Sequence, residues 1–586
     1  MPSTTASIEQ VAGQIFDYII VGGGTAGLVL ANRLSEDPSN TVLVLEAGGA
    51  HFDDAMTSDL GAYLKAFGNP EYDWGFETVP QENADGGVYP WNRGKGLGGS
   101  SAINFYTWLR ASKADIDAWE TLGNPGWNWA QYLKYSKKSE HFFSPVDECK
   151  PESVTYDAEF HGSEGPIAVS FPRAYSGVDD VVRDALHEAG LPGVTDAQAG
   201  ADVGTKYVQA TIDPRTNKRS SALAYLKPVL ARPNLVVLVN ALVHRIVFNS
   251  TLDASGLTAT GVEFGYHQKI HQANANREVL LSAGTIQSPK LLELSGIGNP
   301  AILTDLGVEP IIDLPSVGEN VQEHLHVAIT WELKDSPHLQ EIGPIRTSSD
   351  IDPGASSPPG LIGTYLLPLS QTSLCTGDLA SQLKSSSTRG LEEQWKVQLK
   401  AAKNGSGIGA ILSFPGHLSA PNPPEPGKRY HTLITALNKP FSRGSIHATS
   451  QDPATHPSAN PRYFEQDIDL AILTDLTKFV RSLAFKDELA SVLGQEVNPG
   501  PHVQTDEEIH AWIKKAMQTT YHSAGSCSML PREKGGVIDS SLRVYGTRNV
   551  RVADLSVVPL HIGCQTQATV YAIAEQAADI IKLGKA

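Results

Sequence analysis

The chain begins with apolar runs of strand length separated by a segment rich in glycine. Residues 16–21 read FDYIIV, and a turn-like segment, GGGTAG, follows at 22–27. A second apolar run, TVLVL at residues 41–45, ends in Glu46. Short β-branched runs bounded by glycine are typical of buried strands, so this pattern predicts a strand, a tight turn, a helix and a second strand.

The segment between these two runs has the spacing of a dinucleotide-binding turn. Gly22, Gly24 and Gly27 form a GxGxxG pattern, which lets the backbone approach a pyrophosphate. A helix beginning near Thr25 would point its N–H groups and its dipole at that anion. Glu46 lies about twenty residues past the glycines, where a carboxylate suits a ribose hydroxyl and disfavours a 2′-phosphate. FAD or NAD fits this pattern, and the alternative is an ordinary strand–helix–strand unit without a ligand.

Later in the chain the pattern indicates loops more often than helices. Residues 93–104 read RGKGLGGSSAIN, which is too flexible for a helix interior; its amides and hydroxyls could cradle a second face of a cofactor, or form a plain surface loop. Segments 350–360 and 421–428 are rich in proline and polar residues and predict loops. Residues 438–450 predict a pair of strands around Arg443 and Gly444.

The size and net charge of the chain limit the classes of protein to which it can belong. With 586 residues, of which 41% are hydrophobic, the chain is expected to form at least two domains around a large core. Its formal net charge of −18, with no long run of Lys and Arg, argues against a nucleic-acid partner. The chain contains no apolar stretch of 18 residues, so no membrane span is predicted. Its first residues show no secretory signal, and a cytoplasmic location is expected.

Cysteine and histidine usage gives no sign of a metal or a disulfide framework. The four cysteines, Cys149, Cys375, Cys527 and Cys564, are widely spaced and never form CxxC, so we expect buried, unpaired thiols. No His or carboxylate cluster has the spacing of metal ligands, and no metal is expected.

The order of the motifs resembles the glucose-methanol-choline (GMC) family of FAD-dependent oxidoreductases, in the style of its fungal aryl-alcohol oxidase and dehydrogenase members. After the N-terminal motifs, RSSALAYL at 219–226, AGTIQSPKLLELSGIG at 283–298 and VGENVQEH at 317–324 follow in the family's order. A C-terminal block from 521 to 571 completes the match.

The resemblance implies an α/β fold, with a Rossmann-like FAD-binding domain and a second α+β substrate domain built on an antiparallel sheet. Residues 14–325, with insertions, would form the first domain, 326–514 the second, and 515–586 would return to the first with the catalytic histidine.

The same resemblance implies a non-covalent FAD site. Relatives with a covalent histidyl link carry His inside the GGSS-type loop, where this chain has Ile103. Asn104 resembles a residue near the reactive edge of the flavin, and Val243 ends the strand that contacts the adenine. Asp554 and its adjoining backbone resemble the pyrophosphate and ribityl end. The expected cofactor-binding residues are Gly22, Gly24, Thr25, Ala26, Gly27, Glu46, Gly98, Ser100, Asn104, Val243, Asp554, Gln565 and Thr566.

Alcohol oxidation needs a base for the hydroxyl proton while a hydride passes to flavin N5, and an imidazole suits that task near neutral pH. The family's catalytic histidine matches His522 of YHSAGSC, among 18 histidines in the chain. The family's second polar residue, His or Asn, matches Gln565, eleven positions after Asp554. This is a departure, because an amide donates and accepts hydrogen bonds but exchanges no proton. His561, four residues earlier, is expected to be structural.

The sequence leaves three functions open. The first is oxidation of a primary or secondary alcohol, with O2 or another acceptor removing the electrons. The second, favoured by Gln565, is a redox-neutral step such as a cyclisation in secondary metabolism, and the third is a binding protein that keeps FAD only for folding. An aromatic or polyketide-like substrate is predicted from an aromatic-lined pocket, although the same residues are often core: Phe105, Tyr106, Trp108 and Phe441.

Overall fold

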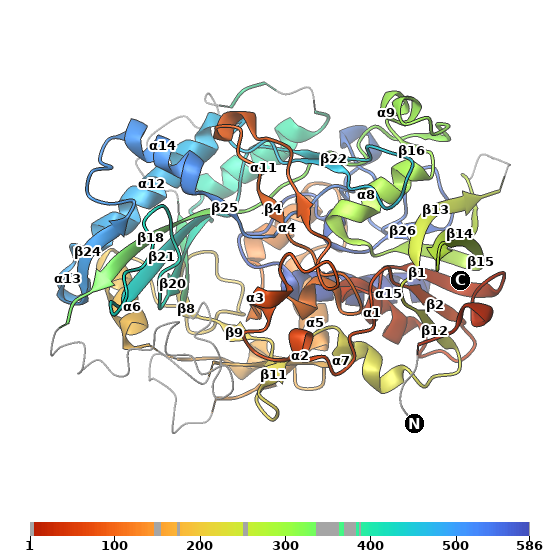
Figure 1. The fold of residues 1–586 in the computed structure, drawn as a ribbon, viewed down its shortest axis with the longest axis horizontal. Coiled ribbons are helices and arrows are strands. Elements are labelled where there is room, and N and C mark those ends of the chain that lie inside the picture. Colours follow the sequence, from red (N-terminus) through yellow and green to blue (C-terminus); the bar gives the residue numbers. More distant parts are fainter. Residues whose placement is uncertain are drawn as a thin grey trace.

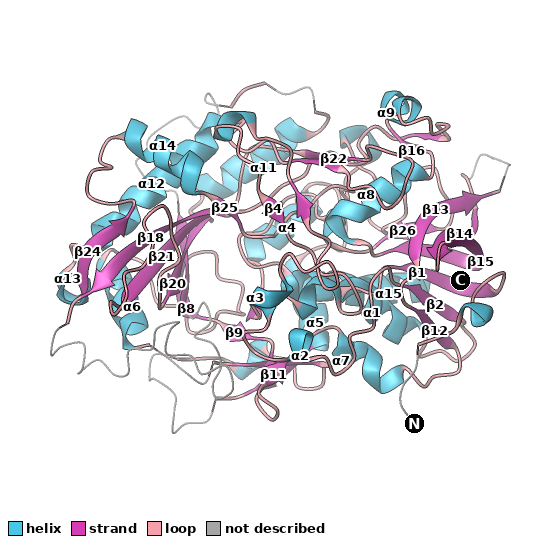
Figure 2. Cartoon of the chain, in the orientation of Figure 1, coloured by secondary structure: helices cyan, strands magenta, loops and turns pink. Residues whose placement is uncertain are grey.

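The structure, a computed structural model, places the chain in two lobes that lie side by side (Figure 1). One lobe holds the N-terminal strands and both chain ends, and the other holds a large antiparallel sheet. Figure 2 shows the two large sheets at opposite ends of the molecule, with loops, helices and short strands between them. The residues described are 5–145, 154–172, 176–249, 256–335, 363–368, 383–385 and 388–584.

The first sheet is built on the two strands that the N-terminal pattern predicts. β1 (Ile15–Val21) lies between β2 (Val42–Leu45) and β15 (Lys269–Leu281), and both neighbours run parallel to it. All of β2 and the last four residues of β1 are buried, which explains why these runs are apolar without alternation. The sheet is completed by β12 (Leu235–Leu238) beside β2, by β14 (Ala259–Tyr266) and β13 (Leu242–Phe248) in antiparallel order beyond β15, and by β26 (Val550–Val552) parallel to β15.

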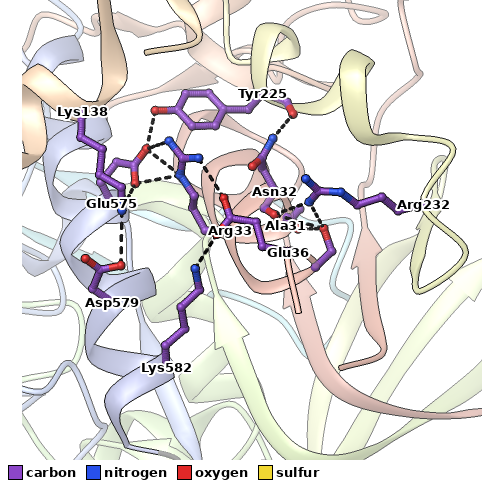
Figure 3. Close-up of polar contacts among 11 residues, drawn as sticks. Ala31, Asn32, Arg33, Glu36, Lys138, Tyr225, Arg232, Glu575, Asp579 and Lys582 are labelled. Carbon is purple, nitrogen blue, oxygen red and sulfur yellow. Dashed lines mark hydrogen bonds and ion pairs between the residues drawn. The ribbon is translucent and has the colours of Figure 1, made fainter. Parts of the chain in front are cut away.

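The C-terminal helix returns to the helix that follows the glycine turn. α1 (Thr25–Leu34) packs on β1 and β2 and against α15 (Gln567–Leu583), which also packs on α5 (Trp129–Ser139). Figure 3 shows the polar contacts between them. The fully buried Glu575 forms an ion pair with Arg33 at 2.7 Å and accepts the Tyr225 hydroxyl at 2.8 Å. The two ends of the chain are thereby joined around one sheet.

The second sheet is antiparallel throughout. Its strand order is β24, β18, β21, β20, β19 and β8, and β25 also pairs with β18. α12 (Asp467–Leu483) packs on β21, β18 and β20. The predicted combination of a parallel-strand lobe and an antiparallel α+β lobe is therefore present, while the boundaries at residues 325 and 514 stay a prediction. The strands are β8 (Gly204–Tyr207), β18 (Leu325–Leu333), β19 (Gly363–Pro368), β20 (Gly407–Phe414), β21 (Tyr430–Leu437), β24 (Leu493–Asn498) and β25 (Gln518–Thr519).

A charged histidine joins α8 (Gly284–Leu294) to β22 (Ser445–His447). His447 Nδ1 lies 2.7 Å from Glu293 Oε1, and its Nε2 lies 3.1 Å from Glu319 Oε1. Burial alone would lower the pKa of His447, but its hydrogen bonds to the two carboxylates raise that pKa to about 9. The imidazole is therefore protonated at neutral pH and forms ion pairs on both sides.

Shorter elements complete the fold. The remaining helices are α2 (Ala55–Ser58), α3 (Tyr63–Ala66), α4 (Lys113–Thr121), α6 (Gly177–Glu188), α7 (Leu223–Leu226), α9 (Pro300–Asp305), α11 (Leu391–Lys403), α13 (Asp487–Val492) and α14 (Asp506–Ala516). A small sheet contains β5 (Thr107–Trp108), β9 (Gln209–Ala210), β7 (Ile167–Ser170) and β6 (Glu140–Phe143). The two-stranded pairs are β3 (Phe76–Glu77) with β4 (Pro90–Trp91), β10 (Ile212–Asp213) with β11 (Lys218–Arg219), and β16 (Ile297–Gly298) with β17 (Ile312–Asp313).

The strand pair predicted within residues 438–450 is wrong. Only β22 lies in this range, and it pairs with β23 (Ser458–Asn460) instead of with a neighbour across Arg443 and Gly444. Pro440 has no amide hydrogen, and its carbonyl accepts a hydrogen bond from Arg443 Nη1 at 2.7 Å, so side chains hold this segment in place of a ladder.

Some of the other local predictions fall on described residues and can be compared with the structure, and others lie outside the described residues. The loop at 421–428 is confirmed, whereas the loop at 350–360 lies outside the described residues. Cys527 and Cys564 are buried, free thiols as expected, and Cys149 and Cys375 also lie outside the described residues. Among the described residues, none of the helices combines the length and apolar character that crossing a membrane requires.

Candidate nucleotide cleft and active site

Gly22 and Gly27 allow α1 to start directly behind β1. Gly22 has φ of 101°, in the left-handed region that favours glycine. A Cβ on Gly27 would lie 1.9 Å from the Gly22 carbonyl oxygen, so only glycine permits this packing. The first bond within the helix runs from Leu28 N to the Gly24 carbonyl. The amides of residues 25 to 27, which include the predicted Thr25 and Ala26, are thus available to an anion at the helix N-terminus.

Glu46 is held by the backbone around this turn. Its Oε2 accepts from Gly23 N at 2.7 Å, and its Oε1 accepts from Gly48 N at 2.8 Å and Gly96 N at 3.0 Å. The carboxylate therefore connects three glycine-rich segments and fixes their separation. Because a carboxylate has about four acceptor sites, one remains for a ribose hydroxyl, and that role stays a prediction.

A cleft opens beside these groups, with about 650 Å³ of empty space when its solvent-open mouth is included. A Cβ on Gly99 would meet Gly24 Cα at 2.8 Å, so the 93–104 loop lies directly on the turn. Gly98, with φ of 94°, precedes it, and the exposed Ser100 accepts from Gly94 N at 3.2 Å. The helix N-terminus, the glycine walls and the carboxylate fit the nucleotide half of a dinucleotide. The cleft residues include Gly22, Gly24, Glu46, Gly99, Val243 and Ala283.

Other predicted cofactor residues are already engaged by the protein. Asn104 Nδ2 donates to Gln567 Oε1 at 2.8 Å, and Asn104 Oδ1 accepts from Arg219 Nη1 at 2.5 Å. The Asp554 carboxylate accepts from Gly284 N at 2.8 Å and from the Ser288 and Ser556 hydroxyls. These bonds tie the N-terminus of α8 and the residues before α15 to the first sheet. Asp554 therefore shapes this end of the site, while Thr566 stands at the N-cap of α15.

His522 lies in a cluster of three histidines drawn from distant segments. Its Nδ1 lies 3.0 Å from His324 Nδ1 and 2.9 Å from the Thr520 hydroxyl. His324 Nε2 lies 2.9 Å from the Ile562 carbonyl oxygen, and His561 Nε2 lies 2.8 Å from the His522 carbonyl oxygen. His522 itself is partly exposed, and none of the described groups forms a hydrogen bond with its Nε2. That nitrogen is the one available for chemistry.

The environment of His522 favours the neutral imidazole. Burial, together with the nearby His561 and Arg93, holds the pKa of His522 well below its usual 6.5. The backbone amide of His522 donates to Glu323 Oε1 at 2.7 Å. Burial raises the pKa of Glu323 to about 7, although the nearby Arg93 acts to lower it. Near neutral pH, His522 is therefore an unprotonated, partly exposed base.

Gln565 lies on the segment that packs against His522. This segment is held at Gly563, whose amide donates to Asp115 Oδ2 at 2.8 Å and whose carbonyl accepts from Asn438 Nδ2 at 2.8 Å. Gln565 is partly exposed, and its buried Oε1 has no hydrogen-bond partner in the part of the chain that the structure describes. A buried amide oxygen without a partner is costly, so this atom is open to a donor from a ligand or a water.

The predicted aromatic pocket is largely wrong in its members. Tyr106, Trp108 and Phe441 are 3%, 0% and 1% exposed and belong to the core. Phe105 is 39% exposed.

Phe105 instead joins a different aromatic cluster, formed with Tyr63, Phe67 and Tyr521. Its ring centroid lies 4.9 Å from that of Tyr63 and 5.7 Å from that of Phe67. Phe67 in turn lies 5.4 Å from Tyr521, the residue before His522. Tyr63 and Phe67 come from a segment in which no motif was recognised, whereas Tyr521 and His324 stand in recognised motifs, YHSAGSC and VGENVQEH, but were given no role.

Known proteins resemble this chain over nearly its whole length. Profiles described as GMC oxidoreductase match residues 16–326 and 440–574. The chain is 37% identical over 595 residues to the GMC oxidoreductase family protein Mala s 12 of Malassezia sympodialis, covering 99% of this chain and 94% of the relative. It is 31% identical to versicolorin B synthase of Aspergillus parasiticus, covering 98% and 89%.

Solved structures show the same likeness. An FAD-dependent oxidoreductase from Chaetomium thermophilum has a TM-score of 0.84 and 30% identity, with 97% of this chain and 99% of that one covered. A fungal aryl-alcohol oxidase has a TM-score of 0.83 and 27% identity, with 97% and 99% covered.

Proposed function

Because this chain belongs to the GMC oxidoreductase family and its cofactor is FAD, we propose that it oxidises a primary or secondary alcohol to the carbonyl, with His522 as the base. The observation that carries the proposal is the state of His522. It is a neutral, partly exposed imidazole whose Nε2 is free of hydrogen bonds from the described residues, and the residue before it, Tyr521, belongs to the aromatic cluster.

The residues of the cleft fit the cofactor. The N-terminus of α1 and the glycines at 22, 24 and 99 would hold the pyrophosphate, while Glu46 and Val243 would hold the adenosine half. Asn104 and Thr566 would lie at the flavin end. Ile103 stands where relatives carry a linking histidine, and it is buried, so attachment is non-covalent.

Each protein group then has a defined task. FAD, when bound, supplies the acceptor for the hydride that leaves the alcohol carbon. His522 Nε2 takes the hydroxyl proton, so that the alcohol loses one hydride and one proton and becomes a carbonyl. The Gln565 amide, whose Oε1 lacks a partner among the described residues, would orient the substrate oxygen. O2 or another electron acceptor must afterwards remove the two electrons.

The aromatic cluster supports an aryl or polyketide-type alcohol as the substrate. Tyr521, the residue before His522, belongs to this cluster, and Phe105 is 39% exposed. Planar substrates gain from edge and face contacts with such rings, by about 0.5–1.5 kcal/mol for each pair.

Gln565 also favours a second candidate, a ring closure without net redox. At the position of the family's second His or Asn, an amide cannot share proton transfers with His522. One relative of similar length is a synthase by name. In that reaction His522 would still remove a hydroxyl proton, and the FAD would stay oxidised.

Anaerobic stopped-flow absorbance separates the two candidates. FAD-loaded protein is mixed with benzylic, allylic and polyketide-type alcohols, and bleaching of the flavin band is expected. His522→Ala should keep FAD and the unfolding temperature but lower the rate of flavin reduction by about a hundredfold or more. His502→Ala, at an exposed histidine, is the matched control.

Two outcomes would argue against the proposal. Absence of bleaching with every alcohol, in protein that holds stoichiometric FAD, would favour the redox-neutral reaction. Normal reduction of His522→Ala would remove His522 from the mechanism. Acid precipitation tests the cofactor link separately, because non-covalent FAD is released into the supernatant.

A further inference from the structure

We infer that His324 sets the tautomer of His522, keeping the proton on His522 Nδ1 and leaving Nε2 free to act as the base. The inference rests on the proposed role of His522 and deepens it, because a neutral imidazole can act as a base only through the nitrogen that carries no proton. His324 is a positioning residue, since it acts through His522 and touches no reacting atom.

A backbone carbonyl fixes the tautomer of His324. The Ile562 oxygen can only accept a hydrogen bond, so His324 Nε2, at 2.9 Å, must carry a proton and donate it. In a neutral His324 the other nitrogen, Nδ1, is then an acceptor. His324 Nδ1 lies 3.0 Å from His522 Nδ1, and two lone pairs do not approach so closely without a proton between them. His522 therefore donates through Nδ1, and its Nε2 bears the lone pair.

His324 accepts through Nδ1 only while it is neutral, and its surroundings keep it neutral. The His324 ring stacks on that of His561 with centroids 3.9 Å apart and an interplanar angle of 22°. Burial, with the adjacent His561 and His522, lowers the pKa of His324 well below its usual 6.5. The partly buried Arg93 adds a positive charge near His522. A positive charge on His324 would therefore have to be buried beside two other imidazoles.

Thr520 cannot replace His324 in this role. Its hydroxyl lies 2.9 Å from His522 Nδ1 and 3.3 Å from the His324 carbonyl oxygen, so it can accept from the first while donating to the second. A hydroxyl rotates and both donates and accepts, so it is compatible with either tautomer of His522. Of the two neighbours of His522 Nδ1, only His324 is fixed as an acceptor, because the Ile562 carbonyl can only accept from its other nitrogen.

His561 has a different task in the same cluster. Its Nδ1 accepts from Ile562 N at 2.9 Å, so its Nε2 carries the proton and donates to the His522 carbonyl at 2.8 Å. This bond fixes the backbone of His522 but leaves the imidazole tautomer undetermined. His561 is thus in keeping with the structural role that the sequence analysis assigned to it.

Two substitutions of His324 separate orientation from packing. His324→Gln keeps an amide oxygen that can accept from His522 and an NH2 that can donate to the Ile562 carbonyl. His324→Leu offers neither. With FAD bound in both variants, His324→Leu should lower the rate constant of flavin reduction by about tenfold or more with little change in substrate affinity. His324→Gln should restore a large part of that loss.

The double variant tests whether His324 acts through His522. In a His522→Ala background, His324→Leu should cause no further loss, because the group that it orients is gone. An additional loss of the same size as in the wild-type background would overturn the inference, as would equal rates for His324→Leu and the wild type.

A spectroscopic readout decides the tautomer without any turnover. Long-range 1H–15N spectra of the FAD-loaded protein with 15N-labelled histidine report which ring nitrogens carry protons. The His522 signals, identified by their loss in His522→Ala, should show a protonated Nδ1 and a bare Nε2. His324→Gln should keep this pattern and His324→Leu should reverse or average it.

A protonated Nε2 in the wild-type protein would overturn the inference even if alcohols reduce the flavin. If no alcohol reduces the flavin, the proposed oxidation fails, while the spectra still decide the tautomer. The two failures are therefore distinguishable.

Discussion

Replacing Gly27 with alanine should prevent α1 from seating on β1, whereas the same change at Gly24 should spare the fold and weaken FAD binding. The added Cβ at Gly27 would lie 1.9 Å from the Gly22 carbonyl oxygen and 3.3 Å from Ile20 Cγ2. Because the first of these is a backbone atom, α1 must retreat by on the order of 1.5 Å, and overpacking of this kind costs about 3 kcal/mol or more.

The matched change at Gly24 meets almost nothing. Its Cβ would find only Gly99 Cα, at 3.8 Å, and the residue has φ of −80°, which alanine adopts freely. The fold should therefore lose less than about 1 kcal/mol. The same methyl would, however, stand in the cleft where the backbone must approach the pyrophosphate, so FAD affinity should fall by about tenfold to a hundredfold.

Thermal unfolding of apoprotein and FAD-loaded protein measures the first effect, and titration of apoprotein with FAD measures the second. Gly27→Ala should unfold at a lower temperature even without FAD, and Gly24→Ala only when FAD is present, because only there does weaker binding reduce stability. A Gly27→Ala protein that unfolds like the wild type would refute the packing argument. A Gly24→Ala protein with unchanged FAD affinity would refute the orientation assigned to the cleft.

Three further predictions concern residues outside this turn. Gln565→His should leave FAD bound and raise alcohol turnover in steady-state assays, and unchanged or lower turnover would count against a proton-handling role at this position. Glu575→Gln should lower the free energy of unfolding by about 2–4 kcal/mol, because it leaves the Arg33 guanidinium, 16% exposed, without its buried charged partner. The control Glu36→Gln, at a 39% exposed side chain, should lower it by less than about 1 kcal/mol; thermal unfolding measures both. The pKa of His447 is raised to about 9, so the stability that the protonated ring contributes is complete below pH 6.5 and is lost as the pH rises through 9. His447→Gln should therefore lower the unfolding temperature more at pH 6.5 than at pH 9.5. An equal loss at both pH values would contradict this.

The sequence could predict those parts of the fold that short-range chemistry determines. β1, the glycine turn and β2 are local, since Gly27 must be glycine only because of Gly22, five residues earlier. The pairing of β1 with β15 and the entry of β8 into the second sheet join segments far apart in the chain, and no local pattern specifies them. Burial is equally non-local, which is why Trp108 could not be distinguished from a ligand-binding aromatic by residue type.

The same limit applies more strongly to the base itself. His522 could be found from its motif, but its ability to take a proton depends on which of its nitrogens is bare. That is determined by His324, which in turn is oriented by the carbonyl of Ile562, and these residues come from three distant segments. A backbone carbonyl is supplied by every residue type, so no amino-acid pattern at position 562 can reveal its role. Substitutions there that keep the backbone in place, such as Ile562→Val, should therefore preserve the tautomer of His522. A change that moves this carbonyl should impair the base without altering any of the three histidines.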